Sequence, residues 1–224
     1  FYRVNADGSV ALLSDQKFYD VENITWAGDS SKAVLEYPDG SNIVYDFAAS
    51  KQFSLPKEMQ DFSFTKDNSK LGAEVIGPSD ENNWLISVNA DGSGARFIER
   101  LGNQADNVDV NWSPDAQIVA LFRKNNGSNS QDIILIGQND ENFRALPVYG
   151  RGFEGNWTPE GDKLLYSVYP AENGFKPTLW MASAKGESIG LNNTPIGLET
   201  WSYKCVTAAD NRTAYCGVPS ALPP

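Results

Sequence analysis

The feature that most constrains this chain is a short motif that recurs along it. The runs WSPDAQ (residues 112–117) and WTPEGDK (157–163) share an aromatic residue, a hydroxyl residue, proline, an acidic residue and a polar turn. Weaker copies begin at Trp26, Phe64 and Thr207, so the intervals along the chain are 38, 48, 45 and 50 residues. A repeat of about this length, built from short strands, predicts an all-β propeller in which each four-stranded antiparallel sheet is one blade.

The third copy shows the expected content of a blade. The runs VDVNW, IVALFR, DIILIG and FRALPV are rich in Val and Ile and are separated by turns, and no segment has a sustained helical period. The same division predicts a single, partial propeller over 1–224, with complete blades at 23–56, 60–100, 108–148 and 155–192. Residues 1–13 and 203–219 would each supply two further strands, or half a blade. The halves either close a five-bladed ring or belong to a six- or seven-bladed ring; we expect the second, because both ends of the sequence stop within a blade.

Composition excludes several classes of function. The chain has no histidine, which removes Ser-His-Asp and Cys-His catalysis and the commonest zinc ligand. A net charge of −11, from 18 basic and 29 acidic residues, argues against binding to nucleic acid or to an anionic membrane surface. No apolar run approaches the roughly 20 residues that span a bilayer. Carboxylate-based chemistry such as glycoside hydrolysis remains open.

Bound metal ions and cofactors are not expected. The acidic turns NADGS, SDEN and QNDEN offer oxygen ligands, but none has the spacing of a Ca²⁺-binding loop. We therefore predict solvated turns at these places.

The repeated motif itself predicts architecture. Pro114 and Pro159 preset the backbone for a turn that Asp115 or Glu160 completes. Trp112 and Trp157 are large enough to fill the space between adjacent twisted blades, and Trp26 and Phe64 occupy the same slot in earlier copies. These seven residues are expected to build the blades and not to carry function: Trp26, Phe64, Trp112, Pro114, Asp115, Trp157 and Pro159.

The motif, together with the repeated NADGS connectors, resembles the WD40-like propeller repeat of TolB-type periplasmic proteins. The segment KCVTAADNRTAYCGVPSALPP is similar to the closing part of uncharacterised, membrane-anchored WD40-like proteins of bacteria. This sequence departs from the pattern where Ala116 replaces glycine and where Ala27 and Gly28 replace Ser and Pro. The resemblance implies a periplasmic or cell-surface protein-binding scaffold without catalytic residues, anchored to the membrane through a segment that precedes the sequence.

The two cysteines lie on the last predicted hairpin. If its turn is centred on Asp210–Asn211, Cys205 and Cys216 face each other directly across the two strands. We predict a disulfide, which is typical of exported proteins; the alternative is a pair of reduced thiols in a cytosolic protein.

The loops predict where recognition takes place. In an antiparallel blade, the loops between the second and third strands and those that lead to the next blade emerge on one face. Aromatic residues and arginine, which are enriched at protein interfaces, gather in these loops. The candidate recognition face is Phe18, Tyr19, Arg123, Tyr149, Arg151, Phe153, Glu199 and Trp201, with Lys124 beside Arg123.

Three functions are compatible with the sequence. We expect a non-enzymatic, extracytoplasmic module that binds a protein partner. The second is the propeller of an enzyme, either a gating domain of a hydrolase or a carboxylate-based glycosidase or lyase. The third is a receptor that binds a sugar or peptide at the mouth of the propeller channel. The sequence leaves the oligomeric state open.

Overall fold

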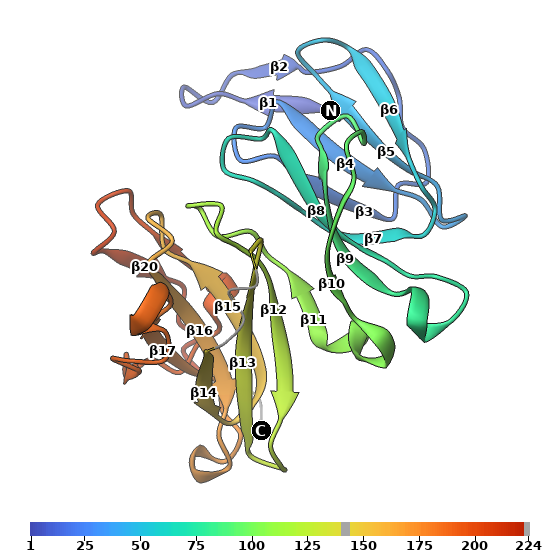
Figure 1. Cartoon of the computed structure of the whole chain (residues 1–224). Helices are drawn as coiled ribbons and strands as arrows, with labels where there is room; N and C mark the ends of the chain where they lie inside the picture. Colours follow the sequence, from blue (N-terminus) through green and yellow to red (C-terminus); the bar gives the residue numbers. More distant parts are fainter. Residues whose placement is uncertain (140–143, 222–224) are drawn as a thin grey trace. The chain divides into compact units, whose positions relative to one another are not determined.

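The computed structural model describes residues 1–139 and 144–221, and the chain divides into two compact units, Phe1–Ala105 and Asp106–Pro224. Each unit contains two four-stranded antiparallel sheets and one two-stranded hairpin (Figure 1). The predicted all-β class, with four complete blades and two half blades, is confirmed.

The first unit begins with the hairpin and continues with the two complete blades, whose strands follow one another in the order of the chain. The elements are β1 (Tyr2–Val4), β2 (Val10–Leu12), β3 (Asn23–Trp26), β4 (Lys32–Glu36), β5 (Asn42–Asp46), β6 (Lys51–Leu55), β7 (Met59–Phe64), β8 (Lys70–Val75), the 3₁₀ helix η1 (Asp80–Asn82), β9 (Trp84–Asn89), β10 (Arg96–Arg100) and the 3₁₀ helix η2 (Gly102–Asn107), which contains the boundary.

The second unit begins with two complete blades and continues with the second hairpin. Its elements are β11 (Val108–Val110), β12 (Ile118–Asn125), β13 (Ser130–Gly137), β14 (Ala145–Tyr149), β15 (Arg151–Trp157), β16 (Lys163–Tyr169), the 3₁₀ helix η3 (Ala171–Asn173), β17 (Thr178–Ser183), the 3₁₀ helix η4 (Gly186–Ser188), β18 (Thr194–Pro195), the 3₁₀ helix η5 (Ser202–Lys204), β19 (Cys205–Thr207) and β20 (Ala214–Cys216).

The connection between β14 and β15 is a single residue, Gly150. Its φ of +126° and the close approach of Pro170 N, 3.1 Å from where a Cβ would lie, make any side chain unfavourable at this position. Because the connection is so short, β15 begins at Arg151 instead of at residue 155.

The repeated turn is built in the same way in all five copies. The fourth residue after the aromatic position has a φ between +55° and +71° in each copy, and its N–H donates to the backbone oxygen three residues earlier, at 2.8–3.0 Å. These five residues are Ser30, Asn68, Ala116, Gly161 and Asn211. The last copy therefore keeps the turn although Thr207 replaces the aromatic residue.

Ala116 adopts this left-handed conformation without being glycine. An alanine in that region carries a steric cost that glycine avoids. We expect Ala116→Gly to raise the free energy of unfolding by about 1 kcal/mol, as measured by urea denaturation. Ala120→Gly, within β12, is the matched control and should destabilise the protein. A loss of stability in Ala116→Gly would contradict the assignment.

Hydroxyl groups hold the carboxylates of these turns in their charged form. Thr65 Oγ1 and Ser69 Oγ donate to Asp67 Oδ1 at 2.6 and 2.8 Å, and the N–H of Ser69 donates at 3.1 Å. These bonds lower the pKa of Asp67 to about 2. Since its folded pKa lies below the unfolded value, Asp67 contributes stability that is present above a pH of about 4 and is lost as the pH falls through about 2.

Ser69→Ala is expected to raise the pKa of Asp67 toward its ordinary value, because it removes the Ser69 hydroxyl, which is one of the three donors to Oδ1. A carboxyl NMR titration measures the midpoint directly. Ser93→Ala, which removes the equivalent donor to Asp91, should leave the Asp67 midpoint unchanged. An unshifted midpoint in Ser69→Ala would show that the hydroxyl does not cause the depression.

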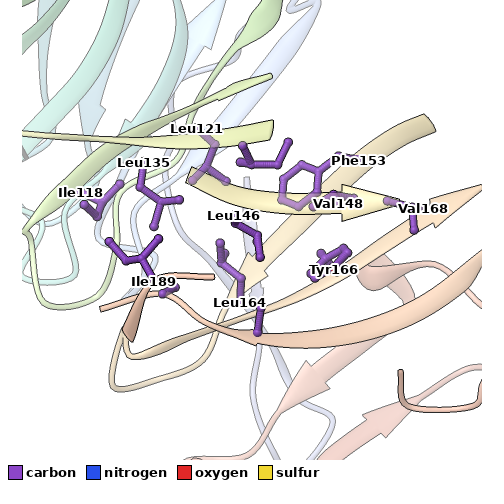
Figure 2. Packing of buried hydrophobic residues seen from close by; sticks show 13 residues of the cluster. Ile118, Leu121, Leu135, Leu146, Val148, Phe153, Leu164, Tyr166, Val168 and Ile189 are labelled. Carbon is purple, nitrogen blue, oxygen red and sulfur yellow. The ribbon is translucent and has the colours of Figure 1, made fainter. Parts of the chain in front are cut away.

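The core of the second unit lies between its two complete blades. Figure 2 shows side chains from β12, β13 and β14 facing Phe153, Leu164 and Tyr166 of the next blade. Trp157 packs partly against this cluster and its Nε1 donates to Asn111 O at 3.1 Å, which joins neighbouring blades. Trp112 is 5% exposed. Trp157 therefore contacts both blades, whereas the place of Trp112 between blades stays a prediction.

The first unit has two clusters. One packs β4 and β5 against β7, β8 and β9, with Phe64 partly buried against it. The other gathers Tyr45, Phe47 and Phe1. Trp26 stacks on Phe47 with ring centroids 5.4 Å apart but is 41% exposed. It is therefore less buried than expected for the aromatic position of the repeated motif.

Candidate functional site

In the second unit, the connections at one end of the strands are linked by hydrogen bonds. Asn129, between β12 and β13, donates through Nδ2 to Glu172 Oε1 at 3.1 Å, and its Oδ1 accepts from Ala171 N at 3.0 Å. The backbone oxygen of Asn129 accepts from Gly150 N at 2.9 Å. One asparagine thus joins three of the connections that sequence analysis assigns to a common face.

Phe175 is the most unusual residue of these connections. It lies between η3 and β17, is 47% exposed, and has a φ of +58°, a region that a bulky side chain rarely adopts. The guanidinium carbon of Arg151 lies 4.6 Å from the centre of its ring. The pair presents an aromatic ring and a positive charge together.

The segment between β18 and β19 adds a second pair of this kind. Lys204 Nζ lies 4.6 Å from the ring centre of Trp201, whose Nε1 donates to the Tyr169 hydroxyl at 2.6 Å. Tyr203 is 57% exposed beside them. In the same segment, Glu199 forms an ion pair with Lys176 at 3.4 Å.

We call this surface the loop face. It comprises Tyr149, Arg151, Phe175, Glu199, Trp201, Tyr203 and Lys204, all from the second unit.

Several predicted recognition residues lie on the loop face and others do not. Tyr149 is 67% exposed, and Arg151, Glu199 and Trp201 lie as described above. Arg123 is half-buried and donates to Asp106 O at 3.4 Å, while Lys124 beside it is exposed.

Phe153 is not a surface residue. It is 5% exposed, and its ring lies 5.3 Å from that of Tyr166 in the core of the second unit (Figure 2). The blade bounds 108–148 and 155–192 predicted a loop here, but the residue belongs to β15, in which side chains alternate between the two faces of the sheet and that of Phe153 points inward.

Phe18 and Tyr19 belong to the first unit. Phe18 packs on Tyr45, with ring centroids 4.9 Å apart, whereas Tyr19 is 71% exposed. Both line a cavity of about 590 Å³ together with Phe1 and Tyr2.

A polar strip follows the first strands of the second unit's two complete blades. Asp109 on β11 and Glu154 on β15 occupy the same position in the repeat, three residues before the tryptophan. Burial raises the pKa of Asp109, and the charge of Arg123 and a hydrogen bond from Asn111 oppose the rise. Partial removal from water also raises the pKa of Glu154, and the nearby Asp109 carboxylate adds to it.

The strip was absent from the predicted site, although a signal for it is present in the sequence. Asn23 and Asp61 stand three residues before Trp26 and Phe64, so polar residues recur at this offset. Phe175, Tyr203 and Lys204 were also missed. Tyr203 and Lys204 follow Trp201 directly, and that neighbourhood was their only sequence signal.

The two cysteines form a disulfide. Cys205 on β19 and Cys216 on β20 are direct partners across the hairpin, with their Cα atoms 4.1 Å apart. The pairing derived from the turn position agrees with this geometry.

Metal ligands are not clustered in the part of the chain that the structure describes: no three of its Cys, Asp and Glu side chains come together in a way that could hold an ion. The QNDEN turn falls partly on residues 140–143, which lie outside the described residues. Among the described residues, no helix has the length and apolar character needed to cross a membrane.

No family model matches the sequence, and no curated protein sequence matches it. Solved structures do. TolB from Acinetobacter baumannii is similar with a TM-score of 0.60 at 14% identity, over 89% of this chain and 50% of TolB. The fold is a TolB-like β-propeller.

Two other similar structures come from enzymes. The propeller domain of the Trilobed protease from Pyrococcus furiosus has a TM-score of 0.54 at 12% identity, covering 80% of this chain and 58% of that one. An oligogalacturonate lyase in complex with manganese has a TM-score of 0.60 at 15% identity, covering 87% and 58%. The chain thus spans half to three-fifths of the length of these proteins. At such identities the similarity shows the fold and not the activity.

Proposed function

We propose that this chain is a non-enzymatic propeller module that binds a protein partner through the loop face. The observation that carries the proposal is Phe175, an exposed aromatic ring on a left-handed backbone. Such a conformation costs of order 1–3 kcal/mol, and residues of this kind are concentrated at functional sites. A residue that weakens the fold and faces solvent has a reason to be there other than stability.

The composition of the loop face supports the same proposal. Tyrosine, tryptophan and arginine are the residues that most often dominate binding energy at protein interfaces. Tyr149, Arg151 and Trp201 supply these types, and Glu199 with Lys176 adds a polar margin. TolB-like neighbours agree with a scaffold of this kind.

The disulfide bears on location. A hairpin closed by Cys205–Cys216 is typical of an oxidising compartment, so we propose an extracytoplasmic protein.

The decisive variant is Phe175→Gly. Glycine removes the backbone strain, so we expect the free energy of unfolding to rise by about 1 kcal/mol while partner affinity falls at least about tenfold. Affinity purification with quantitative crosslinking from the native extracytoplasmic extract measures capture, and urea denaturation measures stability.

The matched control is Phe97→Ala. Phe97 is 61% exposed on β10, outside the loop face, and its removal should leave capture unchanged. Arg151→Ala and Trp201→Ala should reduce capture of the same partners as Phe175→Gly. If all three loop-face variants retain the wild-type partners, the proposal is wrong.

A second candidate is the propeller of a carboxylate-based glycosidase or lyase. It is favoured by one observation: Asp109 and Glu154 lie close enough for the charge of one to raise the pKa of the other. A carboxyl group with a raised pKa is suited to act as a general acid. Hydrolysis or elimination of a polysaccharide that Asp109→Asn abolishes would favour this candidate over binding alone.

A further inference from the structure

The second unit contains a cavity next to the polar strip. Neither the two carboxylates of the strip nor the residues of the loop face line this cavity. Its volume is about 410 Å³, within the range of small-molecule sites. The residues that matter here are Asn111, Asn156, Trp157, Leu165, Cys205 and Thr207. Asn111 directly follows β11, Asn156 and Trp157 belong to β15, and the others come from β16 and the disulfide-bonded hairpin, so the cavity belongs to one unit.

Part of the wall is fixed by hydrogen bonds within the protein. Asn111 donates through Nδ2 to Gly155 O at 3.2 Å, and its backbone oxygen accepts from Trp157 Nε1 at 3.1 Å. The disulfide at Cys205 holds β19 to β20. The ring of Trp157 therefore has a set position and presents its remaining surface to the cavity.

Two polar groups in the same wall are left for a ligand. Among the described residues, neither the side-chain amide of Asn156 nor the hydroxyl of Thr207 makes a hydrogen bond to another side chain or backbone group. Asn156 offers two N–H donors and one acceptor, and Thr207 offers one donor and an acceptor oxygen. Both residues are half-buried, so a ligand in the cavity can reach them.

The charge around the cavity restricts the ligand further. Glu154 precedes Asn156 by two residues on β15, so their side chains emerge on the same face about 7 Å apart. None of the described residues that line the cavity is charged, and the chain carries a net charge of −11. Phosphates and sugar acids would be repelled there without a cation to receive them.

We propose that this cavity binds a neutral sugar ring, with its apolar C–H face against Trp157 and its hydroxyl groups on Asn156 and Thr207. A pyranose matches the wall because it is apolar on its faces and carries donors and acceptors around its edge. An apolar ligand would leave the amide and hydroxyl without partners, which costs free energy.

The test is titration of the whole chain with glucose, galactose, mannose and N-acetylglucosamine, followed by two-dimensional amide NMR. We expect at least one of them to shift the resonances of Asn156 and Thr207 and to saturate. Asn156→Ala and Thr207→Val should each weaken that affinity by about tenfold. Galacturonate, the anionic counterpart of galactose, should bind more weakly than galactose at neutral pH.

Controls separate this site from the proposed partner binding. Phe175→Gly should leave sugar affinity unchanged, and Asn156→Ala should leave partner capture unchanged. Since neither ligand-facing group bonds to the protein, the two variants should melt near the wild-type temperature; if Asn156→Ala unfolds, Asn156→Gln keeps the amide but displaces it and gives the same comparison. The proposal is overturned if no neutral sugar shifts these resonances at millimolar concentration, if both variants bind as tightly as wild type, or if galacturonate binds at least as tightly as galactose.

Discussion

Replacement of Phe153 by alanine is expected to lower the free energy of unfolding by about 3–5 kcal/mol. The side chain is buried in the cluster between two blades of the second unit, with its ring 5.3 Å from that of Tyr166 (Figure 2). A Cβ on Gly155 would lie 2.9 Å from the Phe153 ring, so the backbone beneath it is fitted to this residue. The lost volume leaves a cavity because the strands on both sides are fixed in sheets. Urea or thermal denaturation of the purified chain measures the change.

The comparison with Tyr149→Ala makes this result specific. Tyr149 is an aromatic residue of the same segment, but it is 67% exposed, so its removal should change stability by less than about 0.5 kcal/mol. The two variants are expected to affect different properties: Phe153→Ala reduces stability, whereas Tyr149→Ala reduces partner capture. Equal loss of stability in both would show that the inward orientation of Phe153 is wrong.

Removal of the disulfide should have the second largest effect. The bond closes a loop with a sequence separation of 11 residues, so we expect Cys205→Ser with Cys216→Ser to lower the free energy of unfolding by about 3 kcal/mol. Among residues 1–139 and 144–221, β19 and β20 pair only with each other, so no third strand supports the hairpin there. Faster amide hydrogen exchange in these two strands, together with a lower denaturation midpoint, would report the loss.

A matched control lies next to the bond. Val206 and Tyr215 are direct partners on the same hairpin and are 64% and 67% exposed. Val206→Ala should cost less than about 1 kcal/mol, since an exposed cross-strand pair contributes little. Addition of a reductant to the wild-type chain should reproduce the effect of the double variant. If reduction changes neither exchange nor midpoint, the bond does not hold the hairpin.

The repeat made most of the fold predictable. Each complete blade repeats the same turn and the same aromatic position, so WSPDAQ and WTPEGDK carry enough information to place the sheets. Even the copy at Thr207 folds as predicted, because the turn depends on Asp210 and Asn211 and not on an aromatic residue. The disulfide followed from the same turn.

The candidate site was harder to predict because loop residues do not follow the repeat. Phe153 and Phe175 both stand near glycines in polar surroundings, yet one is buried and the other is exposed. What decides between them is where β15 begins, which the close packing at Gly150 determines, and a hydrogen bond from Phe175 N to Pro170 O at 3.0 Å. Neither interaction has a local sequence signature.

The burial of the middle strands has a consequence for how a partner would bind. Leu121 on β12, Ile133 on β13 and Leu164 on β16 are inaccessible to solvent, and the loops of the loop face extend from these strands. A loop rooted in such strands has little conformational freedom to lose, so binding forfeits less entropy than it would with a mobile loop. A partner would then meet a surface already in its bound form, and changes to that surface should alter how long the complex lasts more than how quickly it forms.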